Sequence, residues 1–402
     1  MTKGANTLPI LIAGSGIGGL AAALGLAKTG RRVIVLEKAS VLSEIGAGIQ
    51  LGPNAFHAFD YLGVGEAARS HAVFIDKLRL MDALTGEDIT AIDLGEEFRK
   101  RFGNPYAVVH RGDLYGVLLS GCRADSRIEL RVKSEVESYD QDGGSVTVRL
   151  VSGERINGSA LIGADGLWSA VRKQVVGDGP PHVSGHTTYR SVIPTEQMPE
   201  DLRWNAATLW AGPKCHIVHY PLSGWKVFNL VVTYHNNAPE PVAGKPVASD
   251  EVMRGFEHIN ERARKIIRHG KDWKLWVLCD REPVDKWGDK RVTLLGDAAH
   301  PMLQYMAQGA CMAMEDAVCL AQMVIDFPDD IEKALEAYRL HRVQRTARVQ
   351  LQSRAIGEHI YHPAGVHAAL RNSIMRAKSS ADWYESLAWL YGGTALNDAN
   401  VS

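Results

Sequence analysis

The 402-residue sequence has few cysteines and no excess of charge of either sign. Its five cysteines are odd in number, lie far apart and include no C-x-x-C pair, which argues against a disulfide framework and against a zinc site. The 45 basic and 46 acidic residues leave a formal net charge of -1, so no positive field attracts a nucleic-acid backbone. We therefore expect no nucleic-acid partner, no metal and a reducing, cytoplasmic location.

The sequence also lacks a hydrophobic run typical of a membrane span. Residues 8–27 are uncharged and follow Lys3, but five of them are glycines, and that much glycine weakens a helix in lipid or in water. Hydrophobic residues make up 46% and charged residues 23% of the chain, as in folded globular proteins. We expect two to three domains, at about 150 residues each, and no transmembrane segment.

Residues 9–36 have the pattern of a strand, a glycine-rich turn, a helix and a second strand. The first apolar run leads into Gly14, Gly16 and Gly19, and the second ends at Glu37. In a dinucleotide-binding unit the first glycine permits the tight turn, the second lets the backbone approach a pyrophosphate and the third allows close helix packing. The acidic residue can accept hydrogen bonds from a ribose diol. This pattern predicts an adenine dinucleotide site.

A second turn of small residues follows the apolar run at 292–295. It spans Gly296 to Pro301 (GDAAHP) and would bring backbone N–H groups and the Asp297 carboxylate close to a ligand. The same carboxylate could instead cap the N-terminus of a helix. The spacing alone leaves both possibilities open.

Residues 316–358 have helical periodicity with a break at Pro328. We interpret Arg342, Arg345 and Arg348 in the second helix as a solvated face or a subunit contact. Upstream, apolar and polar residues alternate in two stretches, 76–93 and 187–234, as in antiparallel strands with one solvated face.

Four segments resemble motifs of the FAD-dependent aromatic hydroxylases, which are monooxygenases made of a single polypeptide. These segments are the glycine fingerprint with Glu37, residues 163–172 (GADGLWSAVR), residues 296–301, and Arg111 within 109–114 (VHRGDL). They occur in the family's order over nearly the whole chain. The resemblance implies that the fingerprint holds the AMP half of FAD and that Asp165 serves both FAD and NAD(P)H. It also implies that Asp297 binds the ribityl chain and that Arg111 points at the flavin.

The resemblance implies an α/β fold in which a Rossmann-like FAD-binding domain is interleaved with a mostly antiparallel-sheet substrate domain. The FAD-binding domain is predicted at 1–75, 103–180 and 286–350, the substrate domain at 76–102 and 181–285, and C-terminal helices at 351–402. Only one G-x-G-x-x-G opens a βαβ unit, and the Cys-x-x-x-x-Cys of pyridine-nucleotide disulfide reductases is missing. We therefore expect NADH to dock transiently beside bound FAD. A homodimer is also implied by the resemblance.

Two further segments narrow the resemblance. Residues 212–222 (GPKCHIVHYPL) and 301–310 (PMLQYMAQGA) are similar to pocket segments of the hydroxylases that convert 3-hydroxybenzoate to 2,5-dihydroxybenzoate (gentisate). The match implies that His216 and Gln304 act on the substrate and that Tyr220 lines its site. The residues alone leave other roles open, namely a structural histidine on a half-buried strand and a loop amide bonded to backbone.

In such enzymes the flavin is reduced by NADH, takes up O₂ as a hydroperoxide and transfers OH to an electron-rich ring. The site must be closed and largely apolar, because water would release the oxygen as H₂O₂. Removal of the phenol proton raises electron density ortho and para to that oxygen, and a histidine with its ordinary pKa of about 6.5 suits this task. His216 is therefore the candidate base.

The sequence leaves two alternatives open. The first is a hydroxylase of salicylate or of another aromatic acid. The second is a non-catalytic flavin-binding or membrane-associated protein, suggested by the three arginines and by Trp383, Tyr384 and Trp389. These aromatic residues are more simply interpreted as core or as a dimer interface.

Overall fold

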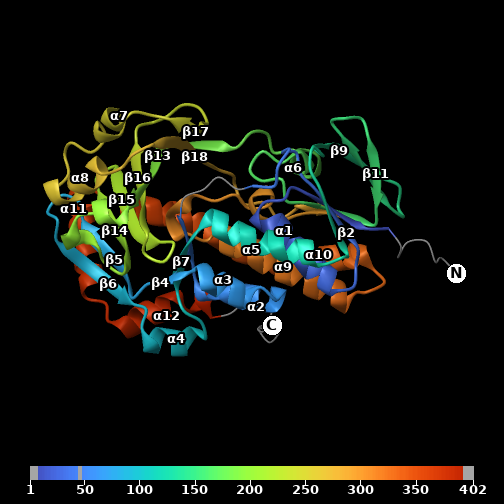
Figure 1. Ribbon diagram of the computed structural model, residues 1–402, viewed down its shortest axis with the longest axis horizontal. Coiled ribbons are helices and arrows are strands. Elements are labelled where there is room, and N and C mark those ends of the chain that lie inside the picture. The colour runs from blue at the N-terminus through green and yellow to red at the C-terminus, as the bar shows by residue number, and fades with distance from the viewer. Residues whose placement is uncertain (1–7, 44–47, 393–402) are drawn as a thin grey trace.

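The computed structural model describes residues 8–43 and 48–392 (Figure 1). Residues 1–7, 44–47 and 393–402 lie outside the described residues, and parts of the predicted domains fall on these three ranges. Within the described ranges, no helix is both long and apolar enough to cross a membrane. The predicted domain limits stay a prediction.

The first sheet has six strands in the order β19-β20-β12-β1-β2-β8 and is parallel except at β19. Its strands are β1 (Ile10–Ala13), β2 (Val33–Leu36), β8 (Ile128–Arg131), β12 (Ala160–Gly163), β19 (Gly288–Asp289) and β20 (Val292–Leu294). Its central strands are apolar throughout because both faces of the sheet are covered.

Helices cover one face of this sheet, and a small sheet covers the other. Ile10 and Val33 pack into a core with the helices α1 (Ile17–Lys28), α5 (Arg111–Ala124) and α9 (Gly309–Asp326). Leu11 and Ile34 point the opposite way, into a core with an antiparallel sheet and α6 (Ala170–Val175). That sheet consists of β9 (Val136–Gln141), β10 (Val146–Leu150) and β11 (Arg155–Gly158).

The second large sheet has eight strands in the order β17-β18-β13-β16-β15-β14-β5-β6, all antiparallel neighbours except β14 and β5. Its strands are β5 (Lys77–Asp82), β6 (Asp88–Asp93), β13 (His182–Pro194), β14 (Ala206–Gly212), β15 (Cys215–Leu222), β16 (Val227–His235), β17 (Ala243–Pro246) and β18 (Lys274–Asp280). Figure 1 shows this sheet at one end of the molecule and β9–β11 at the other. The predicted α/β fold class is confirmed.

The prediction of a solvated face is wrong for β15. All eight of its residues are buried. Ile217 packs into a core that includes Val252 of α7 (Ser249–Met253) and Ile266 of α8 (Glu261–Arg268). These two short helices cover the face that would otherwise meet water, and the other face borders a cavity described below.

The remaining elements connect the two large sheets. They are a three-stranded sheet of β3 (Gly48–Leu51), β7 (Ala107–His110) and β4 (Val73–Phe74); the helices α2 (Pro53–Leu62), α3 (Gly65–His71), α4 (Glu96–Phe102), α10 (Ile331–Ile356), α11 (Gly365–Arg376) and α12 (Ser380–Tyr391); the 3-10 turns η1 (Thr195–Gln197), η2 (Glu200–Leu202), η3 (Gly296–Ala298) and η4 (Gln304–Met306); and the π-helix η5 (Gly357–Tyr361). The predicted pair of helices broken near Pro328 is confirmed as α9 and α10.

The interpretation of the α10 arginines as a solvated face is wrong for Arg342 and Arg345, whereas Arg348 is exposed. The Arg342 side chain is 1% exposed and forms ion pairs with Glu315 and Asp316 of α9, at 2.8 and 2.7 Å. Arg345 pairs with Glu315 at 2.6 Å, and the Arg348 guanidinium lies 3.8 Å from the centre of the Trp389 ring. The apolar helix α9 supplies two buried carboxylates, which draw Arg342 and Arg345 inward.

Candidate active site

The turn between β1 and α1 has the geometry that a dinucleotide requires. Gly14 has φ of +98°, and a Cβ added there would lie 2.5 Å from the carbonyl oxygen of Ala164. A Cβ on Gly19 would lie 2.0 Å from the carbonyl oxygen of Gly14, whereas no atom lies within 4 Å of a Cβ built on Gly16. The first and third glycines are therefore required by packing, and the second faces open space. No side chain caps α1, so its N-terminal N–H groups are available to an anion.

A cavity of about 260 Å³ extends from this turn between Gly14, Glu37 and Asp165. The Glu37 carboxylate accepts hydrogen bonds from the backbone N–H and the hydroxyl of Ser15, at 2.9 and 2.7 Å. It also accepts one from the N–H of Ala39 at 2.8 Å. Burial alone would raise the pKa of Glu37, but these hydrogen bonds outweigh it and leave that pKa below its ordinary value. An ionised acceptor thus lies where the ribose diol of the AMP half is expected.

Asp165 joins the end of β12 to α6. Its carboxylate accepts hydrogen bonds from the N–H groups of Ala170 and Val171, at 2.8 and 3.3 Å, and from the Ser169 hydroxyl. Burial raises the pKa of Asp165. Asp165 therefore organises the start of α6, and its contact with FAD and NAD(P)H stays a prediction.

A larger cavity of about 330 Å³ continues from the first and shares Gly16, Ala164 and Gly166 with it. Arg111, at the start of α5, and Asp297, in η3, line it on the side of the parallel sheet. The two connected cavities form one elongated site, with room for the AMP half at one end and the flavin at the other.

The alternative that Asp297 caps a helix is wrong. The N-cap of η3 is Leu295, with no side-chain hydrogen bond, and the N-cap of α9 is Gln308. The Asp297 side chain is exposed to the cavity, and within the described part of the chain it accepts no hydrogen bond. A carboxylate without a protein partner beside an open cavity fits the role predicted for it, which is to accept hydrogen bonds from the ribityl chain.

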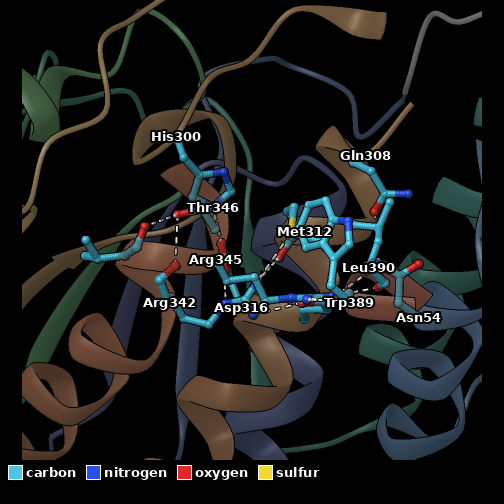
Figure 2. A network of polar contacts seen from close by, with 12 residues as sticks. Asn54, His300, Gln308, Met312, Asp316, Arg342, Arg345, Thr346, Trp389 and Leu390 are labelled. Atoms are coloured by element: carbon cyan, nitrogen blue, oxygen red, sulfur yellow. Dashed lines mark hydrogen bonds and ion pairs between the residues drawn. The ribbon is translucent and has the colours of Figure 1, made fainter. Parts of the chain in front are cut away.

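A buried polar network holds the turn that carries Asp297 (Figure 2). Asp316 accepts hydrogen bonds from the N–H of Gly296 at 3.0 Å, from Nε2 of His300 at 2.6 Å and from Nε of Arg342 at 2.7 Å. Burial would raise the pKa of Asp316, but His300 and Arg342 lower it to about 2. The sequence prediction missed Asp316, although a pair of acids inside an apolar helix is a usable signal for buried ion pairs.

On the opposite side of the larger cavity, one face of the eight-stranded sheet presents the predicted substrate residues. His216, Val218 and Tyr220 of β15 all line the cavity, as their alternation predicts. Nδ1 of His216 is hydrogen bonded to Nε2 of His362 at 2.8 Å. Burial, then the neighbouring His362 and His186, lower the pKa of His216 well below its ordinary value. The ordinary histidine pKa expected from the sequence is therefore wrong for His216, which is a neutral base at neutral pH.

Gln304 is bonded to side chains, so the alternative of a backbone-bonded loop amide is wrong. Its amide donates to the hydroxyls of Thr188 and Thr233, at 3.2 and 3.1 Å, and its carbonyl accepts from Nη2 of Arg190 at 3.3 Å. Tyr220 is 3% exposed, and burial raises the pKa of its hydroxyl, which keeps it protonated. Both residues can therefore donate or relay hydrogen bonds at the cavity wall.

Arg190 is a site residue that the sequence prediction missed. It lines the cavity, where it is half-buried, and burial lowers the pKa of its guanidinium. No ion pair joins it to a carboxylate within residues 8–43 and 48–392, and its Nε has no hydrogen-bond partner there. A half-buried cation that lines a cavity without an anionic partner can bind an anionic ligand there. The alternation of β13 was a usable signal for it.

The sheet order, the glycine turn and the elongated cavity together define a flavoprotein-type dinucleotide fold with an attached ligand cavity. Residues 7–353 match the FAD-binding domain family. The chain is 56% identical to 3-hydroxybenzoate 6-hydroxylase 1 of Aquipseudomonas alcaligenes, over 95% of this chain and 97% of that protein. It is 50% identical to 3-hydroxybenzoate 6-hydroxylase of Polaromonas naphthalenivorans (strain CJ2), over 99% of each. The structure resembles that of Klebsiella pneumoniae HpxO complexed with FAD and uric acid, with a TM-score of 0.83, 25% identity and coverage of 96% and 97%.

The chain belongs to the FAD-binding domain family, and within it to the FAD-dependent aromatic hydroxylases. It is an FAD-dependent aromatic monooxygenase, as the sequence resemblance predicted. The turn, Glu37, Arg111 and Asp297 fit FAD along the two cavities.

Proposed function

We propose that this monooxygenase hydroxylates 3-hydroxybenzoate at carbon 6, giving 2,5-dihydroxybenzoate, with NADH and O₂ as co-substrates. The observation that carries the proposal is the presence of a neutral base, His216, and an unpaired cation, Arg190, on one face of the sheet beside the flavin end of the site. The names of the two relatives described above support the same substrate. One O₂ and one NADH, with a proton, yield the hydroxylated product, NAD⁺ and water.

The strand register spaces the base and the cation for one aromatic ring. His216 pairs with Thr233 of β16, whereas Arg190 pairs with Val231 of the same strand. Strand β16 therefore lies between the strands of the two residues, and along the strand direction the residues are offset by two positions. This spacing puts their Cα atoms about 12 Å apart. Side chains that reach inward over that distance can hold the phenol and the carboxylate, which lie meta to each other on the ring of 3-hydroxybenzoate.

In this pose the protein prepares the ring for attack. Nε2 of His216 accepts the phenol proton, which raises the electron density ortho and para to the oxygen. Arg190 binds the carboxylate, and Gln304 orients the guanidinium through its 3.3 Å hydrogen bond. Tyr220 donates a hydrogen bond to the substrate from the same face.

FAD, when bound, supplies the redox chemistry, because it takes electrons from the reduced nicotinamide and activates O₂. The protein's contribution at that stage is to keep water out. Apolar side chains line the cavity beside the base, namely Val218, Val231, Met302 and Leu303. A dry cavity favours transfer of the oxygen to the ring over its loss as H₂O₂.

The test is steady-state oxidation of NADH and of NADPH by the FAD-loaded enzyme across a panel of hydroxybenzoates, with the product identified by chromatography. We expect 3-hydroxybenzoate to stimulate NADH oxidation most and to give 2,5-dihydroxybenzoate. Strongest stimulation and hydroxylation of salicylate would contradict the proposal.

The role of Arg190 is tested separately with a neutral analogue. Arg190→Met removes the cation that pairs with the carboxylate, so we expect KM for 3-hydroxybenzoate to rise at least tenfold, about 1.4 kcal/mol. KM for 3-hydroxybenzyl alcohol, which has no carboxylate, is expected to change much less. Equal changes for both compounds would show that Arg190 does not bind the carboxylate.

A further inference from the structure

His216 is one end of a group of four histidines that the predicted roles do not explain. The others are His362, which follows η5, His186 of β13 and His235 of β16. The ring centroids of His216 and His362 are 5.1 Å apart, those of His362 and His186 are 5.2 Å apart, and those of His186 and His235 are 4.2 Å apart. The four rings form a continuous row.

The row runs from the cavity towards the protein surface. His216 is 1% exposed and lines the cavity, whereas His362, His186 and His235 are each only partly buried. Within the described residues, a hydrogen bond joins His216 to His362, and the other rings of the row lie in contact. The row therefore leads from the place where the phenol proton is removed towards solvent.

The nitrogen atoms of His216 are arranged for transfer in this direction. Nδ1 is hydrogen bonded to Nε2 of His362 at 2.8 Å, and no residue that the structure describes hydrogen bonds to Nε2 of His216. A neutral imidazole has one nitrogen that donates and one that accepts. His216 can thus accept a proton from the cavity at Nε2 while it donates the proton on Nδ1 to His362.

The surroundings of the four histidines disfavour the protonated, positively charged form of each ring. Burial, followed by the neighbouring histidines, lowers the pKa of His186 to about 4 and that of His362 to about 3. The pKa of His235 is lowered by burial and by Lys214. The groups that shift these rings include no carboxylate in the described ranges. A proton that enters the row therefore leaves it.

Two tyrosines, Tyr305 of η4 and Tyr361 of η5, pack against the row. The Tyr305 hydroxyl is hydrogen bonded to Nδ1 of His186, and the Tyr361 ring lies 4.8 Å from that of His216, centroid to centroid. Burial raises the pKa of both hydroxyls, so they stay protonated and cannot take up a proton as phenolates. Four histidines can also suggest a metal site, but no three histidine, cysteine or acidic side chains in the described ranges are arranged to hold a metal ion.

We propose that His216 passes the substrate's phenol proton through His362 to the partly exposed end of the row, where His186 and His235 lie. The proposal rests on the proposed function in one respect, which is that the substrate is a phenol. His362 then acts through His216 and does not touch the substrate.

Each transfer conserves protons and charge. The phenol O–H bond breaks and a bond from hydrogen to Nε2 of His216 forms, while the proton on Nδ1 moves to Nε2 of His362 and the proton on Nδ1 of His362 leaves for His186 or water. The substrate becomes a phenolate and both rings are neutral again. When the product oxygen takes up a proton, transfer in the reverse direction restores the starting tautomers.

The experiment compares His362→Gln and His362→Ala with the FAD-loaded wild-type enzyme. Glutamine can still hydrogen bond to His216 but cannot pass a proton, so a purely positional role predicts normal behaviour for this variant. The first measurement mixes enzyme and 3-hydroxybenzoate rapidly, without NADH or O₂, and follows the phenolate absorbance of the bound substrate. We expect both variants to form phenolate at least tenfold more slowly, with a similar final amount.

The second measurement is rescue of hydroxylation. We expect imidazole to restore the hydroxylation rate of His362→Ala, and 1-methylimidazole, which cannot accept at one nitrogen and donate at the other, to fail. His359→Ala is the control, because the His359 side chain is 69% exposed and lies outside the row. Wild-type rates in His362→Gln, or equal rescue by both compounds, would overturn the proposal.

Failure of the proposed function can be told apart from failure of the proton-transfer proposal. If the wild-type enzyme hydroxylates another hydroxybenzoate instead, the same measurements are made with that compound, because every hydroxybenzoate carries the phenol proton.

Discussion

At the residue scale, the FAD site depends on two carboxylates that differ in their hydrogen bonds, Glu37 at the AMP end and Asp297 at the flavin end. Glu37 accepts two hydrogen bonds from Ser15 of the glycine turn and one from Ala39, whereas Asp297 accepts none within the described residues. An acceptor that the protein leaves unpaired contributes little to folding and can be used fully by a ligand.

Asp297→Ala is therefore expected to weaken FAD binding without unfolding the protein. Loss of one acceptor for the ribityl chain costs about 1–3 kcal/mol of binding free energy, so a large share of the flavin should be lost on purification. The affinity is measured by titrating the apoprotein with FAD and following flavin fluorescence. Asp140→Ala, an exposed change on β9, is the control. An unchanged Kd in Asp297→Ala would remove Asp297 from the FAD site.

His216→Ala is expected to separate flavin reduction from ring hydroxylation. Loss of a general base slows the assisted step by roughly 10²- to 10⁴-fold, so NADH is still oxidised but the oxygen is released as H₂O₂. The ratio of H₂O₂ to hydroxylated product measures this effect. His219→Ala is a matched control, because His219 is also buried on β15 but does not line the cavity. Normal coupling in His216→Ala would make His216 a structural residue.

At the scale of elements, α9 and α10 show where prediction from the sequence stops. The periodicity and Pro328 predicted both helices, because the apolar spacing is a local signal. The direction in which Arg342 and Arg345 point is not local. Basic residues three apart are typical of a solvated face, and only the packing of α10 on α9 brings them to Glu315 and Asp316.

Arg342→Met is expected to destabilise both the protein and its FAD site. Removing one partner of a buried ion pair costs about 3–5 kcal/mol, because Glu315 and Asp316 keep their charges in the core. Thermal unfolding and FAD affinity are the measurements. Arg339→Met is the control, since Arg339 pairs with Glu336, whose side chain is 54% exposed, and such a pair contributes at most about 1 kcal/mol. Equal effects of the two changes would contradict the buried network.

The same network sets a pH dependence. The pKa of Asp316 is about 2 in the folded protein, below the value of about 3.9 expected in the unfolded chain. Its contribution to stability is therefore complete above pH 4 and is lost as the pH falls towards 2. The difference in stability between the wild type and Arg342→Met is expected to shrink over that range.

At the scale of the whole molecule, the active site lies where two sheets from distant parts of the sequence meet. The FAD-binding part of the site was predictable, because the glycine turn and the GDAAHP turn are compact motifs whose chemistry depends on residues close together in the sequence. The substrate end was predictable only in part. His216 and Tyr220 share a face by strand alternation. Arg190 lies on another strand and is placed by the strand register, and His362 lies in the segment that follows η5.

The regiochemistry of hydroxylation tests this arrangement of the whole site. The phenolate oxygen of 3-hydroxybenzoate activates carbons 2, 4 and 6, so electronics alone does not select one of them. If His216 holds the phenol and Arg190 holds the carboxylate, the ring has one orientation in the cavity, and we expect the carbon para to the phenol to face the flavin end beside Asp297 and Arg111. The product is then 2,5-dihydroxybenzoate. A ring held in the opposite sense gives 3,4-dihydroxybenzoate, and chromatography against both standards distinguishes them. A dominant 3,4-dihydroxybenzoate peak would contradict the proposed pose and leave the aromatic monooxygenase class unchanged.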